Sequence, residues 1–118
     1  MSPRIDGVGL ALVETARVQR LIERFGDAGL ARVFSPAELD YARKAADPLE
    51  RLAARLAAKL ALQGALGRAR RVPLRAIEVA RDPDGRPGLR WPGAAPCIAH
   101  VSFSHERGLT VASVWLEV

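Results

Sequence analysis

The sequence predicts an α+β fold, because one strand is followed by helical segments and then mainly by strands. The segment Ile5 to Leu12 is short, apolar and glycine-containing, which is typical of a buried strand. Two later segments begin with a capping residue and a proline, as helices do. With 118 residues and no linker or internal repeat, residues 1–118 are expected to form a single compact domain.

Three helices are predicted after the first strand. Helical spacing of apolar residues predicts the first over Val13 to Phe25. Ser35-Pro36-Ala37-Glu38 supplies an N-cap, a proline and a capping-box glutamate for a second helix reaching about residue 46. Asp47 to Leu66 forms the longest helix, with Gly67 where a C-cap belongs.

The rest of the chain is mainly predicted strand. Ile77 to Arg81 is expected to be a strand, followed by a turn at Asp82 to Gly85 and a second arm that includes Leu89 to Trp91. Cys97 to Ser104 and Leu109 to Leu116 contain β-branched and aromatic residues, and the short polar segment between them favours a hairpin.

The composition narrows the classes of partner. Eighteen basic residues against 13 acidic residues give a net charge of +5, which favours anionic partners. Only 5% of residues are aromatic, without the aromatic and basic interleaving of a stacking platform, so a nucleic-acid partner is not expected. No apolar run approaches about 20 residues, so no membrane partner is expected. The single cysteine, Cys97, fits a reducing cytoplasm, where we expect the protein to reside.

Four separated motifs carry a family resemblance. They are Gly7-Val8-Gly9-Leu10-Ala11-Leu12-Val13-Glu14, Arg55-Leu56-Ala57-Ala58-Lys59, Ile77-Glu78-Val79 with Asp84-Gly85-Arg86-Pro87, and Val101-Ser102-Phe103-Ser104-His105. In order and spacing the chain resembles the holo-acyl-carrier-protein synthases, the short trimeric branch of the 4'-phosphopantetheinyl transferases. The resemblance implies their fold, a trimer, and transfer of phosphopantetheine from coenzyme A to a carrier-protein serine, with magnesium held by carboxylates of the first strand and the long helix.

The chain departs from this family at the magnesium ligands. Where the family has an aspartate in the strand motif and a glutamate after the helix lysine, this sequence has Ala11 and Leu60. A further family lysine corresponds to Gly64. Asp6 is a poor substitute because its odd separation from Ala11 directs it to the other face of a regular strand, and Glu14 matches a residue that the family also carries. We therefore expect no magnesium held by protein carboxylates.

The family's carrier-docking residues are partly kept. Arg17, Arg20 and Arg24 are spaced to share one helix face. At Arg17 and Arg24 this stripe resembles positions that grip the acidic recognition helix of an acyl carrier protein. The alternative is a solvated helix face, which is the usual explanation of a charge stripe.

Four residues are candidates for binding coenzyme A. By resemblance Arg55 and Lys59 border its site, although both could instead be exposed residues that cover a trimer surface. Ser104 and His105 resemble a serine-histidine pair that lies near coenzyme A in the family. The weak candidates for catalysis are His105, whose pKa range suits a general base, together with Glu14 and Lys59.

Three hypotheses follow for function. The first is a degenerate homologue that binds an acyl carrier protein of a fatty-acid or polyketide type pathway with little or no intrinsic transfer, and for which coenzyme A binding stays open. The second is an active transferase, either with magnesium supported by substrate and water or with a missing half-site supplied by another subunit, in a homotrimer or a mixed trimer with a paralogue. The third is a fold recruited to a metal-independent reaction that uses His105, Glu14 or Ser104.

Overall fold

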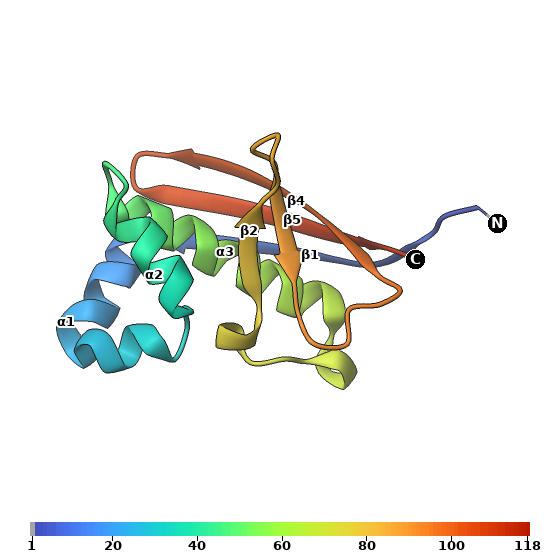
Figure 1. Cartoon of the computed structure of the whole chain (residues 1–118), viewed down its shortest axis with the longest axis horizontal. Helices are drawn as coiled ribbons and strands as arrows, with labels where there is room; N and C mark the ends of the chain where they lie inside the picture. The colour runs from blue at the N-terminus through green and yellow to red at the C-terminus, as the bar shows by residue number, and fades with distance from the viewer. Residues whose placement is uncertain (1) are drawn as a thin grey trace.

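The computed structural model describes residues 2–118 and confirms the α+β prediction (Figure 1). None of the helices in this range is long and apolar enough to cross a membrane. The elements in chain order are β1 Ile5–Glu14, α1 Thr15–Ala31, α2 Pro36–Arg43, α3 Pro48–Leu66, η1 Arg68–Arg70, η2 Leu74–Ala76, β2 Glu78–Arg81, β3 Pro87–Arg90, β4 Ile98–Glu106 and β5 Leu109–Glu117.

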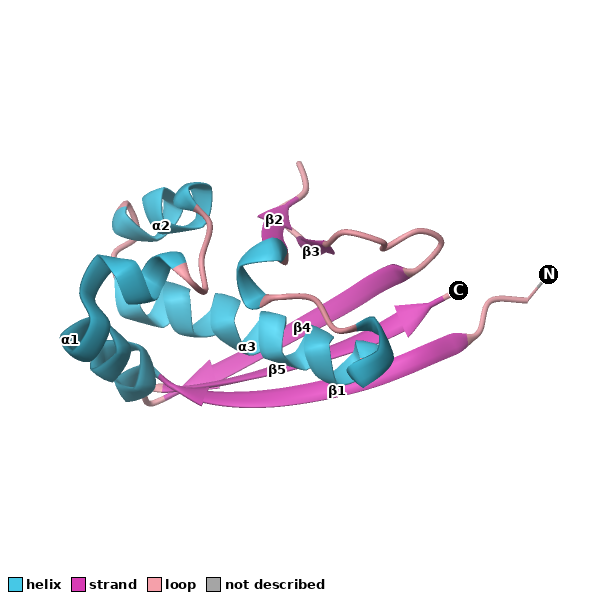
Figure 2. Ribbon diagram, turned by 90° about the horizontal axis from the view of Figure 1, so that it is seen from below, coloured by secondary structure: helices cyan, strands magenta, loops and turns pink. Residues whose placement is uncertain are grey.

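The main sheet has three antiparallel strands in the order β1-β5-β4, and β2 and β3 form a separate hairpin. Figure 2 shows the helices on one face of the main sheet, with α3 lying along it and the other face bare. Alternation along each strand therefore divides the side chains into an inner set facing α3 and an outer set. The register places Ala11, Ala112 and Phe103 in one row across the three strands.

Helix α3 lies unusually close to β1, and glycine makes this approach possible. A Cβ atom at Gly9 would collide with the backbone carbonyl of Ala61, and one at Gly7 with that of Ala65. Glycine in a strand interior often marks such close backbone packing. The glycines of the first motif therefore seat the alanine-rich helix on the sheet.

The boundary between the first strand and the first helix differs from the prediction. Strand β1 continues through Val13 and Glu14 because both residues pair with β5, so α1 begins at Thr15 instead of Val13. The predicted end at Phe25 is confirmed, because Gly26 has non-helical angles of φ 60° and ψ −150°. The prediction missed a second helical segment beyond Gly26, which continues to Ala31. The continuation is held by buried Leu30, which belongs to the core cluster.

The outer face of the main sheet is apolar and uncovered. Leu10 is 71% exposed, and the other large exposed apolar residues on this side of the sheet include Val8, Leu12 and Ile98. On this face His100 stacks on Trp115 with ring centroids 4.1 Å apart. A contiguous exposed apolar face of this kind is typical of an interaction surface.

Candidate functional site

A buried ion pair fixes the framework of the site. Lys59 of α3 is fully buried, and its Nζ atom donates to Glu38 Oε1 at 2.6 Å and to the Val33 carbonyl at 2.7 Å. The other carboxylate oxygen of Glu38 accepts from the backbone N–H of Val79 at 3.1 Å. This cluster joins α3 to α2, to the α1–α2 connection and to β2, since each donor or acceptor lies on a different segment.

The buried surroundings of Lys59 determine whether its ammonium can contact a ligand. Burial lowers its pKa, and the hydrogen bond and negative charge of Glu38 oppose this effect. The sequence analysis left two locations open for Lys59, one bordering coenzyme A and one exposed on a trimer surface. In the structure its ammonium is instead enclosed in the core. Any contact between Lys59 and a ligand would require the pair with Glu38 to open.

Arg55 lies one turn before Lys59 and is 5% exposed. Its guanidinium sits 4.5 Å from the ring centroid of Tyr41, and that of Arg51 lies 5.2 Å from the same ring. The Nε atom of Arg55 has no hydrogen-bond partner among residues 2–118. Burial lowers the pKa of Arg55, while the charges of Glu38 and Tyr41 oppose the shift. A buried guanidinium with an unused donor is suited to receive an anion.

A pocket of about 320 Å³ opens beside these arginines. The two candidates Arg55 and His105 both line it, from α3 and from the end of β4. At its edge His105 Nε2 lies 2.7 Å from Glu50 Oε1, a contact between two half-exposed side chains. The pocket is lined by Ala46, Asp47, Glu50, Arg51, Ala54, Arg55, Val79, Arg81, Pro87, Phe103 and His105. We call it the arginine pocket.

The predicted serine-histidine pair is divided by the sheet. His105 is on the inner side of β4 with Phe103, and both line the arginine pocket. Ser104 alternates to the outer side, in the row of Val111 and Leu12. The two side chains therefore belong to different surfaces, and within one chain Ser104 does not line the arginine pocket.

The two positions that the sequence resemblance aligns with the family's magnesium ligands, Ala11 and Leu60, carry apolar side chains. Ala11 and Leu60 are both partly buried and packed against the core cluster. Their methyl and isobutyl groups offer no oxygen ligand, and Asp6 is engaged in an ion pair with Arg70. Within residues 2–118 no group of three or more acidic, histidine or cysteine residues is arranged to hold a metal ion. These residues do not fit magnesium, which requires several oxygen ligands.

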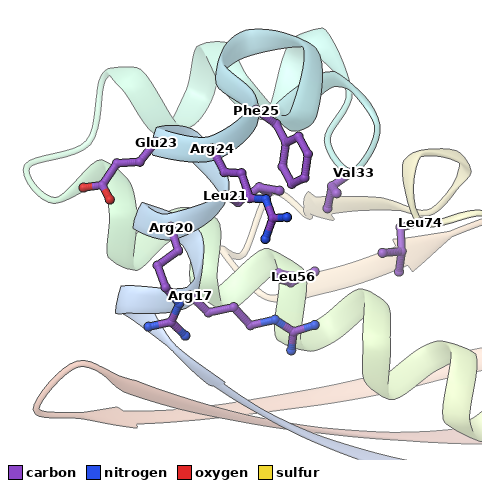
Figure 3. A pocket seen from close by; sticks show the side chains of 9 residues that line it. All are labelled: Arg17, Arg20, Leu21, Glu23, Arg24, Phe25, Val33, Leu56 and Leu74. Carbon is purple, nitrogen blue, oxygen red and sulfur yellow. The ribbon is translucent and has the colours of Figure 1, made fainter.

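A second concave surface lies along α1. A groove of about 570 Å³ has an apolar floor formed by Leu21, Val33, Leu56 and Leu74. The three arginines of the predicted stripe, Arg17, Arg20 and Arg24, line it, as does Phe25. Figure 3 shows Arg24 reaching toward the floor between Leu21 and Leu56, whereas Glu23 points away from it. We call this surface the α1 groove.

Several residues of these two surfaces were missed by the sequence analysis. Arg51, one turn before Arg55 on α3, could have been found from their shared helix face. Arg81 of β2 lines the pocket and Tyr41 of α2 lies against Arg51 and Arg55, so only the tertiary structure brings these residues together. Glu14, a weak catalytic candidate, is exposed and precedes α1 without a side-chain capping bond.

Comparisons with known proteins agree with this architecture. The family model for the 4'-phosphopantetheinyl transferase superfamily matches residues 7–114. The holo-[acyl-carrier-protein] synthase of Koribacter versatilis is 42% identical, over 96% of this chain and 98% of the relative. The crystal structure of the Neisseria meningitidis synthase covers 98% of this chain and 100% of its own, with 28% identity and a TM-score of 0.82.

A second solved structure has a bound ligand. The holo-(acyl-carrier-protein) synthase of Bacillus anthracis, in complex with CoA (3',5'-ADP), is 31% identical with a TM-score of 0.79 and covers 96% of each chain. The sequence motifs, the fold and a family-model match over nearly the whole chain agree. The chain therefore belongs to the 4'-phosphopantetheinyl transferase superfamily.

Proposed function

We propose that this protein binds an acyl carrier protein of a fatty-acid or polyketide type pathway and has little or no intrinsic phosphopantetheinyl transfer activity. The observation that carries the proposal is the apolar chemistry of Ala11 and Leu60, which gives magnesium no ligand where the family has carboxylates. Phosphoryl-group transfer depends mainly on electrostatic stabilisation of the transferring group. Without that stabilisation, the surfaces that would bind the carrier protein and coenzyme A are the parts of the family's site that this chain keeps.

The α1 groove supports binding of a carrier protein. Its apolar floor suits the apolar side of an amphipathic helix, and the arginines at its rim suit acidic residues flanking that side. Phe25 is 55% exposed beside Arg24, whose guanidinium lies 5.4 Å from its ring centroid. A charge stripe that only faces solvent needs no such apolar floor. The groove therefore favours docking of a carrier protein over a solvated helix face.

The arginine pocket supports binding of the phosphorylated part of coenzyme A. Arg55 brings a buried guanidinium with an unpartnered donor, and Arg51 and Arg81 add positive charge at the same pocket. The Bacillus anthracis relative was solved with CoA (3',5'-ADP). We propose that His105 borders this ligand from β4, with Glu50 as its present partner.

A second candidate function is an active transferase completed by another subunit. It is favoured by the 42% identity to a protein named as a holo-[acyl-carrier-protein] synthase and by the arginine pocket. In this arrangement a paralogue in a mixed trimer would supply the missing carboxylates. Transfer by a mixture with a competent paralogue that is faster than transfer by the same amount of that paralogue alone would favour this function over the first.

The deciding experiment incubates an apo carrier protein with this protein, coenzyme A and magnesium, and measures the carrier by mass spectrometry alongside a pull-down. We expect the carrier to be retained on the pull-down and to gain no phosphopantetheine mass. A stoichiometric gain of that mass by this protein alone would overturn the proposal. Loss of carrier binding would also contradict it.

Reversing the charge of the stripe is expected to weaken carrier binding strongly. In the variant Arg17→Glu, Arg20→Glu, Arg24→Glu, three acidic groups would face the acidic helix, and affinity should fall about a hundredfold. The matched control reverses three exposed arginines outside the groove, Arg68→Glu, Arg71→Glu and Arg75→Glu. Because both variants change the net charge equally, a similar fall in both would show that overall charge, not the α1 groove, attracts the carrier. Affinity is measured by calorimetry at fixed salt.

We further propose that the bare outer face of the sheet mediates self-association into a homotrimer. Leu10→Lys places a charge among Val8 and Leu12, and burial of that charge should weaken association by at least about a hundredfold. The control is Phe25→Lys, which adds the same charge at an exposed apolar residue of the α1 groove. Light scattering after gel filtration should show the smaller mass for Leu10→Lys only. An unchanged mass in both variants would exclude this face as the interface.

A further inference from the structure

We propose that Tyr41 is a positioning residue that holds Arg51 and Arg55 in place for a phosphorylated ligand of the arginine pocket. The proposal deepens the coenzyme A part of the proposed function and rests on it. Tyr41 belongs to α2, whereas both arginines belong to α3, so the contact crosses between two helices. No motif of the sequence assigns a role to this tyrosine.

The geometry is that of one ring contacted by two guanidinium groups. Their Cζ atoms lie 4.5 Å (Arg55) and 5.2 Å (Arg51) from the centroid of Tyr41. Both distances are within the range in which an aromatic face attracts a cation. The phenol contributes less, because Arg51 Nη1 lies 3.5 Å from Tyr41 Oη, too far for a strong hydrogen bond. The ring of Tyr41, and not its hydroxyl, is therefore the main group that holds the guanidinium groups of Arg51 and Arg55 in place.

The ring contact offsets an electrostatic repulsion among the arginines of the pocket. Arg51, Arg55 and Arg81 repel one another, and Arg55 is also desolvated with its Nε atom unpartnered among residues 2–118. The acids at the pocket are committed elsewhere: Asp47 caps α3 and Glu50 contacts His105. Glu38 is held by Lys59. An aromatic face stabilises clustered cations without neutralising them, so the positive charge stays available to a phosphate.

The titration of Tyr41 reports on the same charges. Although burial acts to raise it, the pKa of Tyr41 is lowered overall by the positive charges of Arg51, Arg81 and Arg55. A phosphate in the pocket would neutralise these cations and raise that pKa back toward its ordinary value of about 10. Tyr41 is the chain's one tyrosine, so its ionisation can be followed without interference from another phenol.

The experiment titrates 3',5'-ADP into the wild type, Tyr41→Phe and Tyr41→Leu by calorimetry. Tyr41→Leu removes the ring and should weaken binding about fivefold to tenfold, whereas Tyr41→Phe keeps the ring and should stay within about twofold. Tyr41 is 43% exposed, so both variants should keep the fold, which circular dichroism checks. In the wild type, 3',5'-ADP should lower tyrosinate absorbance at a fixed alkaline pH, and adenosine without phosphates should not.

The outcomes separate the two proposals. If the wild type binds 3',5'-ADP and Tyr41→Leu binds it equally well, the positioning role is overturned while coenzyme A binding stands. Tyr41→Phe weakened as much as Tyr41→Leu would move the role from the ring to the hydroxyl and overturn the proposal as stated. If the wild type does not bind 3',5'-ADP, the coenzyme A part of the proposed function is wrong, and the role of Tyr41 is overturned with it.

Discussion

Replacing Ala11 with aspartate and Leu60 with glutamate is expected to raise magnesium-dependent transfer of phosphopantetheine by about a thousandfold over the wild type. Metal ions supply several kcal/mol of transition-state stabilisation, and each 1.36 kcal/mol corresponds to a factor of ten in rate. The variant Ala11→Asp, Leu60→Glu restores the oxygen ligands that the wild type lacks at these positions. The measurement is the initial rate of carrier modification by mass spectrometry, with and without magnesium.

The packing around these positions decides how the experiment is designed. Ala11 and Leu60 are partly buried against the core, so two new carboxylates without a metal would repel each other and destabilise the fold. Magnesium should therefore raise the melting temperature of the double variant and leave that of the wild type unchanged. This thermal shift tests metal binding independently of activity.

Two single variants are the matched controls. Ala11→Asp alone and Leu60→Glu alone each supply one carboxylate, and each should show less than a tenth of the gain of the double variant. A double variant that binds magnesium and stays inactive would show that the rest of the pocket has diverged. Adding Gly64→Lys then tests the third departure, since a Cβ atom at Gly64 would meet only Gly9 Cα, at 3.6 Å. A wild type as active as the double variant would refute the degenerate interpretation.

Local signals in the sequence predicted the starts of α2 and α3 well. The capping box at Ser35 is present, with Ser35 Oγ accepting from the Glu38 N–H at 3.2 Å and Glu38 Oε1 accepting from the Ser35 N–H at 2.9 Å. Asp47 likewise caps α3 by accepting from the Glu50 N–H at 3.1 Å. Such bonds join residues three positions apart, so the residue types alone specify them.

Contacts between distant segments could not be predicted in the same way. The capping box identifies Glu38 as a helix-start residue, but its carboxylate also binds Lys59, 21 positions away, and the N–H of Val79, 41 positions away. Sequence alone left Lys59 either bordering coenzyme A or exposed on a trimer surface, and it did not reveal the partner that a buried lysine needs. The division of Ser104 from His105 is different, since strand alternation already implies it.

The buried pair of Lys59 and Glu38 leads to the second large prediction. Lys59→Met is expected to lower the free energy of unfolding by about 3–5 kcal/mol, because it leaves the Glu38 carboxylate buried without its cation. Methionine approximately preserves the volume and length of the lysine stem, so a cavity contributes little to the loss. Urea unfolding followed by circular dichroism measures the change.

The chain provides a matched control for this substitution. Lys44 pairs with Asp40 at 3.3 Å on the surface of α2, with the two side chains 77% and 66% exposed. Lys44→Met makes the same chemical change in a solvated pair and should cost no more than about 0.5 kcal/mol. Equal losses in the two lysine variants would contradict a special role of the buried pair.

A second variant separates the lost ion pair from lost packing. Lys59→Met combined with Glu38→Gln removes both charges, and the amide oxygen can still accept from one of the two backbone N–H groups, of Ser35 and Val79, that the carboxylate binds. If an uncompensated carboxylate is the main cost, the double variant should recover at least about half of the stability lost in Lys59→Met.

Because Glu38 anchors α2, which carries Tyr41, the same recovery should restore 3',5'-ADP binding in the arginine pocket. A double variant that regains stability but not binding would show that the pair's charge, beyond its anchoring of α2, is needed at the pocket.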